Sequence, residues 1–285
     1  MLKPLNPQEF DRWADFAYEL ALDTTKSGYP TYTDGIKTWD DFMAHARRAL
    51  TDENEAILLY ERDGAVAGWI HYYWIPEDRY LDTSSFCIAE GMGDAVKEFT
   101  AFARERFPGY TLYLGFPREN RDAVTALEAL GFTLIEESYN DVLDFDGYEP
   151  RPEDPAIVPV TRETYPLFAA LHAQHDWDMY WNTERILNAL DSWKIFVLLR
   201  RGAAAGAIYS RQFQDKQLSE IFGVDFPGGV YDGAAFRALM TAALNHEKRR
   251  GTGHMVCFTE EDSHPDALAC GYRCVGQYVC YQLAL

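Results

Sequence analysis

The chain has 285 residues, which is enough for two domains of about 100–150 residues each. Hydrophobic residues make up 47% and aromatic residues 15%, so the composition excludes a disordered chain and predicts well-packed cores. The formal net charge of −19 disfavours non-specific binding to nucleic acid or anionic membranes, and it favours a cationic ligand such as an amine, although acidity also serves solubility.

The first residues predict a strand followed by an amphipathic helix, because an apolar stretch at residues 2–6 precedes Phe10, Trp13 and Phe16 at helical spacing. Two apolar runs on either side of a glycine-bearing turn at residues 64–68 then predict a β-hairpin. A second helix is expected after Gly93, where apolar residues again recur at helical spacing.

The same order of elements recurs in the second half of the chain. Gly202 follows Gly64 at an offset of 138 residues, and Gly233 follows Gly93 at an offset of 140. The starting segments lie 155 residues apart, so the first copy carries about 17 extra residues, many of them at positions 24–38. We therefore predict two tandem domains, residues 1–147 and 156–285, joined by a linker at 148–155 whose prolines and charges cannot continue a strand.

Each predicted domain contains strands and helices in a mixed α/β order, with a right-handed β-α-β unit after the second glycine segment. The expected fold class is therefore a mixed-sheet α+β sandwich, present twice. Neither a secretory h-region nor a run of about 18 apolar residues is found, so we expect a cytoplasmic protein.

Cysteine and histidine spacing argues against a structural metal. The five cysteines are odd in number and form no CxxC pair, which favours a reducing compartment over a disulfide framework. Cys270, Cys274 and Cys280 lie near His254 and His264 without the paired spacing of a zinc site, and His172 and His175 form a pair without further ligands. The expectation is no bound metal. Serine-hydrolase elbows and nucleotide P-loops are also missing from the sequence.

Two segments carry the more specific signal. Residues 120–132 read Asn-Arg-Asp-Ala-Val-Thr-Ala-Leu-Glu-Ala-Leu-Gly-Phe, and residues 224–235 read Val-Asp-Phe-Pro-Gly-Gly-Val-Tyr-Asp-Gly-Ala-Ala. With the order of elements, they resemble the GNAT superfamily of N-acetyltransferases over nearly the whole chain, twice over. That family has an apolar-x-Pro segment, then Gln/Arg-x-x-Gly-x-Gly/Ala, and later Asn-x-x-Ala-x-x-x-Tyr-Glu-x-x-Gly-Phe.

The resemblance implies acetyl-CoA as cofactor, bound by the second copy. Val224 and Phe226 would pair their backbones with the pantetheine arm, and Asn120, from the matching motif of the first copy, is a further candidate cofactor-binding residue. Small residues and free N–H groups at a helix start suit a pyrophosphate. The residues that would cradle it are Gly228, Gly229, Val230, Tyr231, Asp232, Gly233, Ala234 and Ala235.

Departures from the family pattern concern charge and the general acid. Val230 and Glu90 stand in the two copies where Gln or Arg is usual, and Leu127 and Ala267 stand where a tyrosine usually protonates the leaving CoA thiolate. Glu220, four residues before Val224, is the candidate base, and a solvent-facing strand glutamate is the alternative reading.

Aromatic residues near the two motifs are further candidates for the site. The candidates for the missing acid are Tyr231, Tyr278 and Tyr281, and those for an acceptor pocket are Trp177, Tyr180 and Trp181. Packing within the core is the alternative for both groups.

The resemblance predicts transfer of an acetyl group from acetyl-CoA to a small, cationic amine. One alternative is a catalytically degenerate pair that serves as an acyl-CoA sensor or a protein-binding scaffold. Another is an amide- or ester-forming acyltransferase that uses a different acyl-CoA. The identity of the acceptor, the active copy and the oligomeric state stay open at this point.

Overall fold

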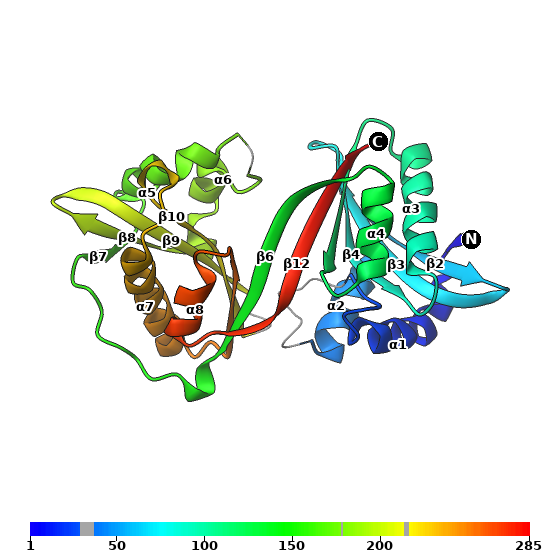
Figure 1. The fold of residues 1–285 in the computed structure, drawn as a ribbon, viewed down its shortest axis with the longest axis horizontal. Helices are drawn as coiled ribbons and strands as arrows, with labels where there is room; N and C mark the ends of the chain where they lie inside the picture. The colour runs from blue at the N-terminus through cyan, green and yellow to red at the C-terminus, as the bar shows by residue number, and fades with distance from the viewer. Residues whose placement is uncertain (29–36, 178, 214–216) are drawn as a thin grey trace. The chain divides into compact units, whose positions relative to one another are not determined.

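The computed structural model describes residues 1–28, 37–177, 179–213 and 217–285. Residues 29–36, which belong to the predicted insertion of the first copy, lie outside the described residues. Contacts divide the chain into two compact units, which we call unit 1 (Met1–Ser138 with Gly276–Leu285) and unit 2 (Tyr139–Val275) (Figure 1).

Unit 1 follows the predicted order of elements, and the predicted first strand, first helix, hairpin and second helix are all confirmed. Its elements are β1 (Leu2–Pro4), α1 (Phe10–Ala21), α2 (Trp39–Arg48), β2 (Glu55–Arg62), β3 (Ala65–Ile75), β4 (Tyr80–Ile88), α3 (Met92–Arg106), β5 (Thr111–Pro117) and α4 (Arg121–Ala129). The β2–β3 turn places Asp63 and Gly64 at positive φ, the backbone that a two-residue hairpin turn requires.

Unit 2 repeats this order. Its elements are β7 (Ile157–Pro159), α5 (Tyr165–His172), α6 (Thr183–Asn188), β8 (Trp193–Arg200), β9 (Ala203–Phe213), β10 (Leu218–Asp225), α7 (Gly233–Arg250), β11 (His254–Thr259) and α8 (His264–Cys270). The predicted hairpin around Gly202 is β8–β9, and the predicted helix after Gly233 is α7.

Both sheets are mixed and share one pattern of neighbours. In unit 1 the strand order is β1-β2-β3-β4-β5-β12, with β4 and β5 parallel and the other neighbours antiparallel. In unit 2 the order is β7-β8-β9-β10-β11-β6, with β10 and β11 as the parallel pair. The predicted mixed α/β class is confirmed.

The last strand of each sheet comes from the other sequence copy. β12 (Arg273–Ala284) pairs with β5 through residues 278–284, and β6 (Thr133–Asp144) pairs with β11 through residues 139–144. The compact units and the predicted sequence domains therefore differ in which copy supplies the last strand.

Helices pack on both faces of each sheet, which gives every unit two hydrophobic clusters. In unit 1, α3 and α4 pack with Phe86 and Leu114 on one face, while α1 and α2 pack with Trp69 on the other. In unit 2, α7 and α8 pack with Ile221, and α5 and α6 pack with Tyr209 (Figure 1). Each sheet is thus the central layer of a sandwich.

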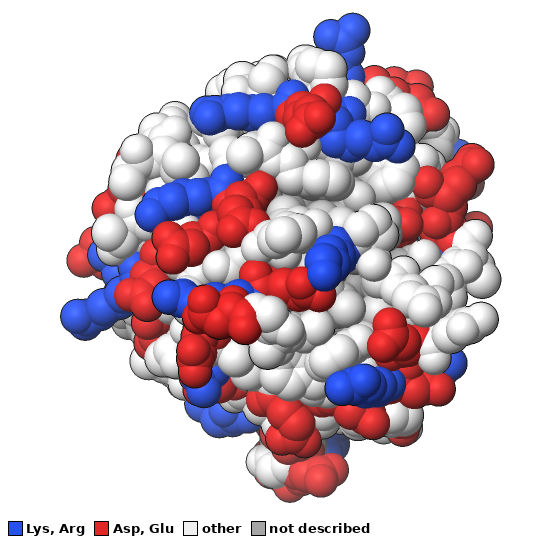
Figure 2. Space-filling model, turned by 90° about the vertical axis from the view of Figure 1, so that its right-hand side faces the viewer, with Lys and Arg blue, Asp and Glu red and all other residues white. Residues whose placement is uncertain are grey.

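The surface carries both signs of charge. Figure 2 shows one face of the molecule, on which Lys and Arg side chains are scattered among Asp and Glu side chains and form no basic patch there. Every helix among the described residues is too short or too polar to cross a lipid bilayer.

Candidate functional site

The parallel strand pair of each unit separates part of the way along its length. β4 pairs with β5 only at Tyr80 and Leu81, although β4 continues to Ile88. β10 pairs with β11 from Leu218 to Ile221 and continues to Asp225. Both β4 and β10 also carry a register shift against their antiparallel neighbours. Each unit therefore has a wedge between two diverging parallel strands, where a backbone edge becomes available for an extended ligand.

In unit 1 this wedge is filled by the chain itself. The Gly28 N–H donates to the Phe86 carbonyl at 2.8 Å, the Ile88 N–H donates to the Lys26 carbonyl at 2.9 Å, and Ser27 and Cys87 form an antiparallel bridge. Residues 26–28, which we call the plug, thus take the β4 edge that would otherwise be open.

The opposite side of the plug contacts β5 and the start of α4. A Cβ atom added to Gly28 would lie 2.8 Å from the Phe116 ring, so the plug fits closely against β5. Asn120, buried and placed at the N-cap of α4, donates its side-chain amide to the Ser27 carbonyl at 3.4 Å and accepts from the Ala123 N–H. The predicted cofactor-binding Asn120 therefore holds the plug in this structure.

The first-copy counterpart of the candidate base lies on β4. Asp82 accepts hydrogen bonds from the Tyr80 hydroxyl at 2.7 Å and from the Thr83 N–H at 2.6 Å. Burial raises the pKa of Asp82 to about 6, against the lowering effect of these bonds. Because the folded-state pKa lies above the unfolded value, this carboxyl stabilises the fold below about pH 4, and the contribution is lost as the pH rises through 6.

Replacing Asp82 by Asn should therefore raise the free energy of unfolding at pH 7.5 by about 1 kcal/mol and leave it unchanged or lower at pH 4. The gain stays modest because the Asn amide has one acceptor oxygen, whereas the two oxygens of the Asp82 carboxylate accept from the Tyr80 hydroxyl and the Thr83 N–H. Urea unfolding at the two pH values measures the effect, and the exposed Glu77→Gln is the control. Equal changes at both pH values would contradict the raised pKa.

The wedge of unit 2 is a cavity of about 350 Å³, within the range of small-molecule sites. Its walls combine the end of β10, the end of β11 and the segment after α5. The residues that line it include Gln174, His175, Val224, Asp225, Phe226 and Tyr231. The two units thus differ at the corresponding place: unit 1 holds the plug, and unit 2 holds an open cavity.

The lining of this cavity is acidic. Asp225, Glu260 and Asp262 belong to it, and none of its described residues is Lys or Arg. Such a lining attracts a cation and repels an anion at short range.

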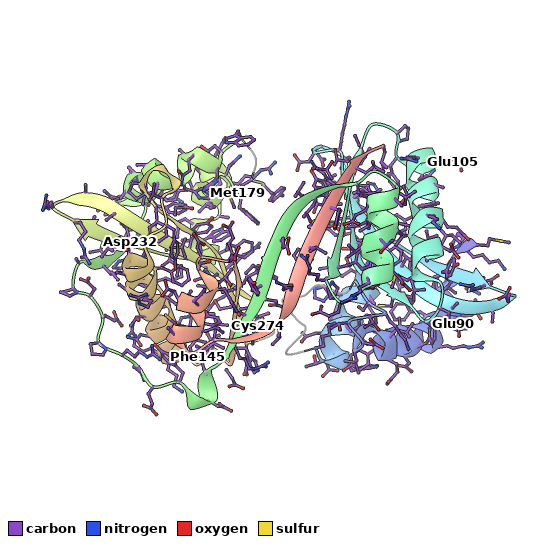
Figure 3. The ribbon with its side chains drawn as sticks, viewed as in Figure 1. Glu90, Glu105, Phe145, Met179, Asp232 and Cys274 are labelled. Atoms are coloured by element: carbon purple, nitrogen blue, oxygen red, sulfur yellow. The ribbon has the colours of Figure 1, made fainter. Side chains whose placement is uncertain are left out.

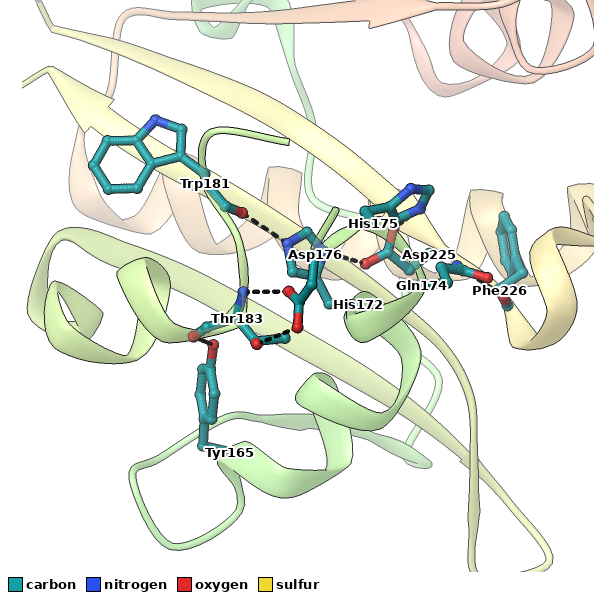
Figure 4. Close-up of polar contacts among 9 residues, drawn as sticks. All are labelled: Tyr165, His172, Gln174, His175, Asp176, Trp181, Thr183, Asp225 and Phe226. Atoms are coloured by element: carbon teal, nitrogen blue, oxygen red, sulfur yellow. Dashed lines mark hydrogen bonds and ion pairs between the residues drawn. The ribbon is translucent and has the colours of Figure 1, made fainter. Parts of the chain in front are cut away.

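A buried histidine supports the end of β10. His172 Nδ1 lies 2.8 Å from Asp225 Oδ2, and its Nε2 lies 2.8 Å from the Trp181 carbonyl oxygen (Figure 4). A carbonyl and a carboxylate both accept, so each ring nitrogen must donate and the ring is an imidazolium. The other Asp225 oxygen lies 3.4 Å from His175 Nε2.

The pKa of His172 reflects this arrangement. Burial acts to lower the pKa, but the hydrogen bonds to Asp225 and Trp181, together with the Asp225 charge, outweigh burial and raise it. Since His172 and Asp225 are both buried, the charged pair joins the end of α5 to the end of β10 in the interior of unit 2.

The turn predicted to hold the pyrophosphate contains two glycines at positive φ, and the helix that follows it, α7, is capped by a side chain. Gly228 and Gly229 have φ of 64° and 68°, a conformation open to glycine. Asp232 is the N-cap of α7, and its carboxylate accepts from the N–H groups of Ala234 and Ala235 at 3.0 Å each. Figure 3 labels Asp232 beside this helix. Two N–H groups predicted to meet a pyrophosphate are therefore taken by a carboxylate.

The remaining predicted residues of this turn differ in position. Val230 is 72% exposed and lies outside the cavity lining, whereas Tyr231 lines the cavity and donates its hydroxyl to Asp266 at 2.6 Å. Burial and the Asp266 hydrogen bond raise the pKa of Tyr231. Gly233 opens α7, and a Cβ added there would meet the Asp266 carboxylate.

Glu220 lies on β10 opposite Arg211 and Val256 and is nearly buried, so it is not a solvent-facing strand residue. The cavity lining does not include it. Leu127 and Ala267, at the usual tyrosine positions, are both fully buried in the hydrophobic clusters.

The aromatic candidates for an acceptor pocket are not part of the cavity lining. Trp177 is 83% exposed, and Trp181 packs edge-on against Trp193 at 5.3 Å. Gln174 and His175, which precede these residues in the same segment, do line the cavity. Their polar character gave no periodic signal that could have identified them.

The chain resembles solved structures over nearly its whole length. A GCN5-related N-acetyltransferase from Sphaerobacter thermophilus has a TM-score of 0.66 at 15% identity, covering 99% of this chain and 95% of the other. A tandem GNAT protein from the clavulanic acid biosynthesis pathway has a TM-score of 0.57 at 16% identity, covering 99% and 98%. A GNAT-family acetyltransferase from Colwellia psychrerythraea has a TM-score of 0.51 at 12% identity, covering 99% of both chains.

No protein-family model and no curated protein matches the sequence of this chain. The structural likeness confirms the predicted fold: the chain contains the GNAT acetyltransferase fold twice, in tandem.

Proposed function

We propose that this protein is an N-acyltransferase that binds acetyl-CoA in unit 2 and transfers the acetyl group to the amine of a small, cationic acceptor. The observation that carries the proposal is the contrast between the two wedges. The β4 edge in unit 1 is hydrogen-bonded to the plug, while the β10 edge in unit 2 borders a cavity of about 350 Å³. The GNAT fold supports acyl transfer as the general reaction.

The residues present fit the acyl-pantetheine arm of the cofactor. Val224 lines the cavity from the diverging part of β10, and Phe226 lines it from the residue directly after this strand. Gly228 and Gly229 give the following turn the backbone freedom to approach a phosphate. Bound acetyl-CoA would supply an acetyl group activated as a thioester. The Asp232 cap and the acidic cavity lining both oppose its pyrophosphate.

The acidic lining suits the acceptor. Glu260 and Asp262 would attract an ammonium group, which must lose a proton before it attacks a carbonyl carbon. Glu220 remains our proposed base. The cavity offers His175 as a second proton acceptor, since its Nε2 lies 3.4 Å from Asp225 Oδ1 and Nδ1 is then left to accept. Loss of acyl transfer in Glu220→Gln alone would identify Glu220 as the base, and loss in His175→Gln alone would identify His175.

Calorimetric titration of the full chain with acetyl-CoA tests the binding site. We expect one site per chain, with binding lost in Val224→Trp, because the indole would occupy the cavity, and kept in Val230→Trp, because that side chain is exposed outside the lining. Two sites per chain, or equal behaviour of the two variants, would contradict the assignment to unit 2.

The alternative of a degenerate binding module has its own support in the two buried residues at the tyrosine positions, Leu127 and Ala267. Binding of acetyl-CoA without release of free thiol in the presence of a panel of amines would favour this alternative. We also propose a cytoplasmic location, which the odd number of cysteines without a CxxC pair supports.

A further inference from the structure

Three different ligand types converge in unit 2 outside the cavity. Asp141 comes from β6, His264 is the first residue of α8, and Cys274 is the second residue of β12. An oxygen, a nitrogen and a sulfur atom of these residues all lie within 4.8 Å of one another. Figure 3 labels Cys274 where β12 begins.

Asp141 is the unusual member of this cluster because its side chain is fully buried. Oδ2 accepts from the Thr259 hydroxyl at 2.5 Å and lies 2.8 Å from His264 Nδ1. Oδ1 is buried as well and has no hydrogen-bond partner among the described residues. A buried carboxylate oxygen without a partner is costly, and a bound ion is one of its common explanations.

The charge of this carboxylate faces a histidine. Among the residues that the structure describes, the cationic partner of Asp141 is His264, which is positive only when protonated. A divalent cation would compensate the buried charge and satisfy Oδ1 at the same time.

We propose that Asp141, His264 and Cys274 form a binding site for a zinc-like divalent transition metal. Carboxylate oxygen, imidazole nitrogen and thiolate sulfur are the ligands that zinc takes, and three protein ligands leave a fourth position for water. Bonds of about 2.0–2.3 Å place tetrahedral ligand atoms roughly 3.3–3.8 Å apart, so the widest separation in the cluster needs a contraction of at most about 1 Å. The exposed side chain of Cys274 can supply this movement.

The supporting residues suit such a site. Thr259 fixes the Asp141 carboxylate by its short hydrogen bond, and the His264 ring lies parallel to the Tyr139 ring with centroids 4.0 Å apart. Contacts of this kind orient metal ligands. The proposed site departs from the sequence-based expectation of no bound metal, which rested on local spacing: Asp141 lies 123 residues before His264 and approaches it only in the folded chain.

The proposed metal site does not depend on the proposed acyl transfer, and it can be tested without measuring enzymatic activity. The full, reduced chain is titrated with Co²⁺, which takes zinc sites and gives a thiolate-to-cobalt charge-transfer band in the near ultraviolet. We expect the band to saturate at one Co²⁺ per chain and to disappear on addition of Zn²⁺. Cys274→Ser should abolish the band, and His264→Gln should weaken Co²⁺ binding about tenfold or more.

His254→Gln is the matched control, since His254 also faces a carboxylate, Asp144, at 3.9 Å. It should leave the titration unchanged. Alkylation by iodoacetamide gives a second measurement on the unmutated chain: Cys274 is the exposed cysteine of the five, so Zn²⁺ should slow its alkylation at least tenfold. Absence of the band in the unmutated chain, a band that survives in Cys274→Ser, or alkylation that Zn²⁺ does not slow would overturn the proposal.

Discussion

Replacing His172 by Leu should lower the free energy of unfolding at pH 6 by about 3–5 kcal/mol, because the buried carboxylate of Asp225 loses its charged partner. The Trp181 carbonyl loses its donor in the same variant. Urea unfolding followed by circular dichroism measures the change. His254→Leu, which removes a partly exposed histidine from the same unit, should change stability by about 0.5 kcal/mol or less.

The pH dependence of this difference has a fixed sign. The folded-state pKa of His172 is raised, so its ionisation stabilises the fold fully below about pH 6.5, and the contribution is lost as the pH rises through the folded-state pKa. The gap between the unmutated chain and His172→Leu should therefore shrink from pH 6 to pH 9. A gap that is constant with pH would show that His172 acts through packing alone.

A double variant separates charge from packing further. Adding Asp225→Asn to His172→Leu removes the uncompensated charge, so part of the lost stability should return. If the second substitution only adds to the damage, the pair is not coupled as its 2.8 Å contact indicates. The same pair bears on function, since Asp225 lies at the end of β10 and lines the cavity.

The order of elements was accessible from the sequence because local signals repeat at a nearly constant offset. Glycines at 64 and 202 mark the two hairpin turns, and those at 93 and 233 open the helices that follow the diverging strands. These features depend on a few neighbouring residues each. The exchange of β6 and β12 between the units could not be predicted, because the two strands have similar apolar patterns and either fits the same place in a sheet.

The candidate site was predictable only where its residues are adjacent in sequence. The turn at residues 228–235 follows directly from its glycines, and the cavity does border it. The plug at residues 26–28 and the pair of His172 with Asp225 depend on contacts across 60 and 53 residues, for which the sequence has no periodic signal. Asn120 shows the limit best: its motif was recognised, but its amide binds the plug rather than an open wedge.

The second large effect concerns Asp232. Asp232→Asn should strengthen acetyl-CoA binding by about tenfold, equivalent to about 1.4 kcal/mol. The carboxylate accepts from the N–H groups of Ala234 and Ala235 and would stand beside a pyrophosphate that carries the same sign of charge. Asparagine caps helices about as well as aspartate, so the free energy of unfolding should stay within about 0.5 kcal/mol.

A matched control distinguishes this local effect from a general reduction of the −19 charge. Asp94→Asn removes one carboxylate from the first turn of α3, at the corresponding helix of unit 1, where the plug fills the wedge. Calorimetry should find the affinity of Asp94→Asn unchanged. Equal strengthening in both variants would point to long-range electrostatics, and strengthening in Asp94→Asn alone would move the cofactor to unit 1. Only a gain confined to Asp232→Asn supports a pyrophosphate at the start of α7, because the charge removed is the one at the N-cap of that helix.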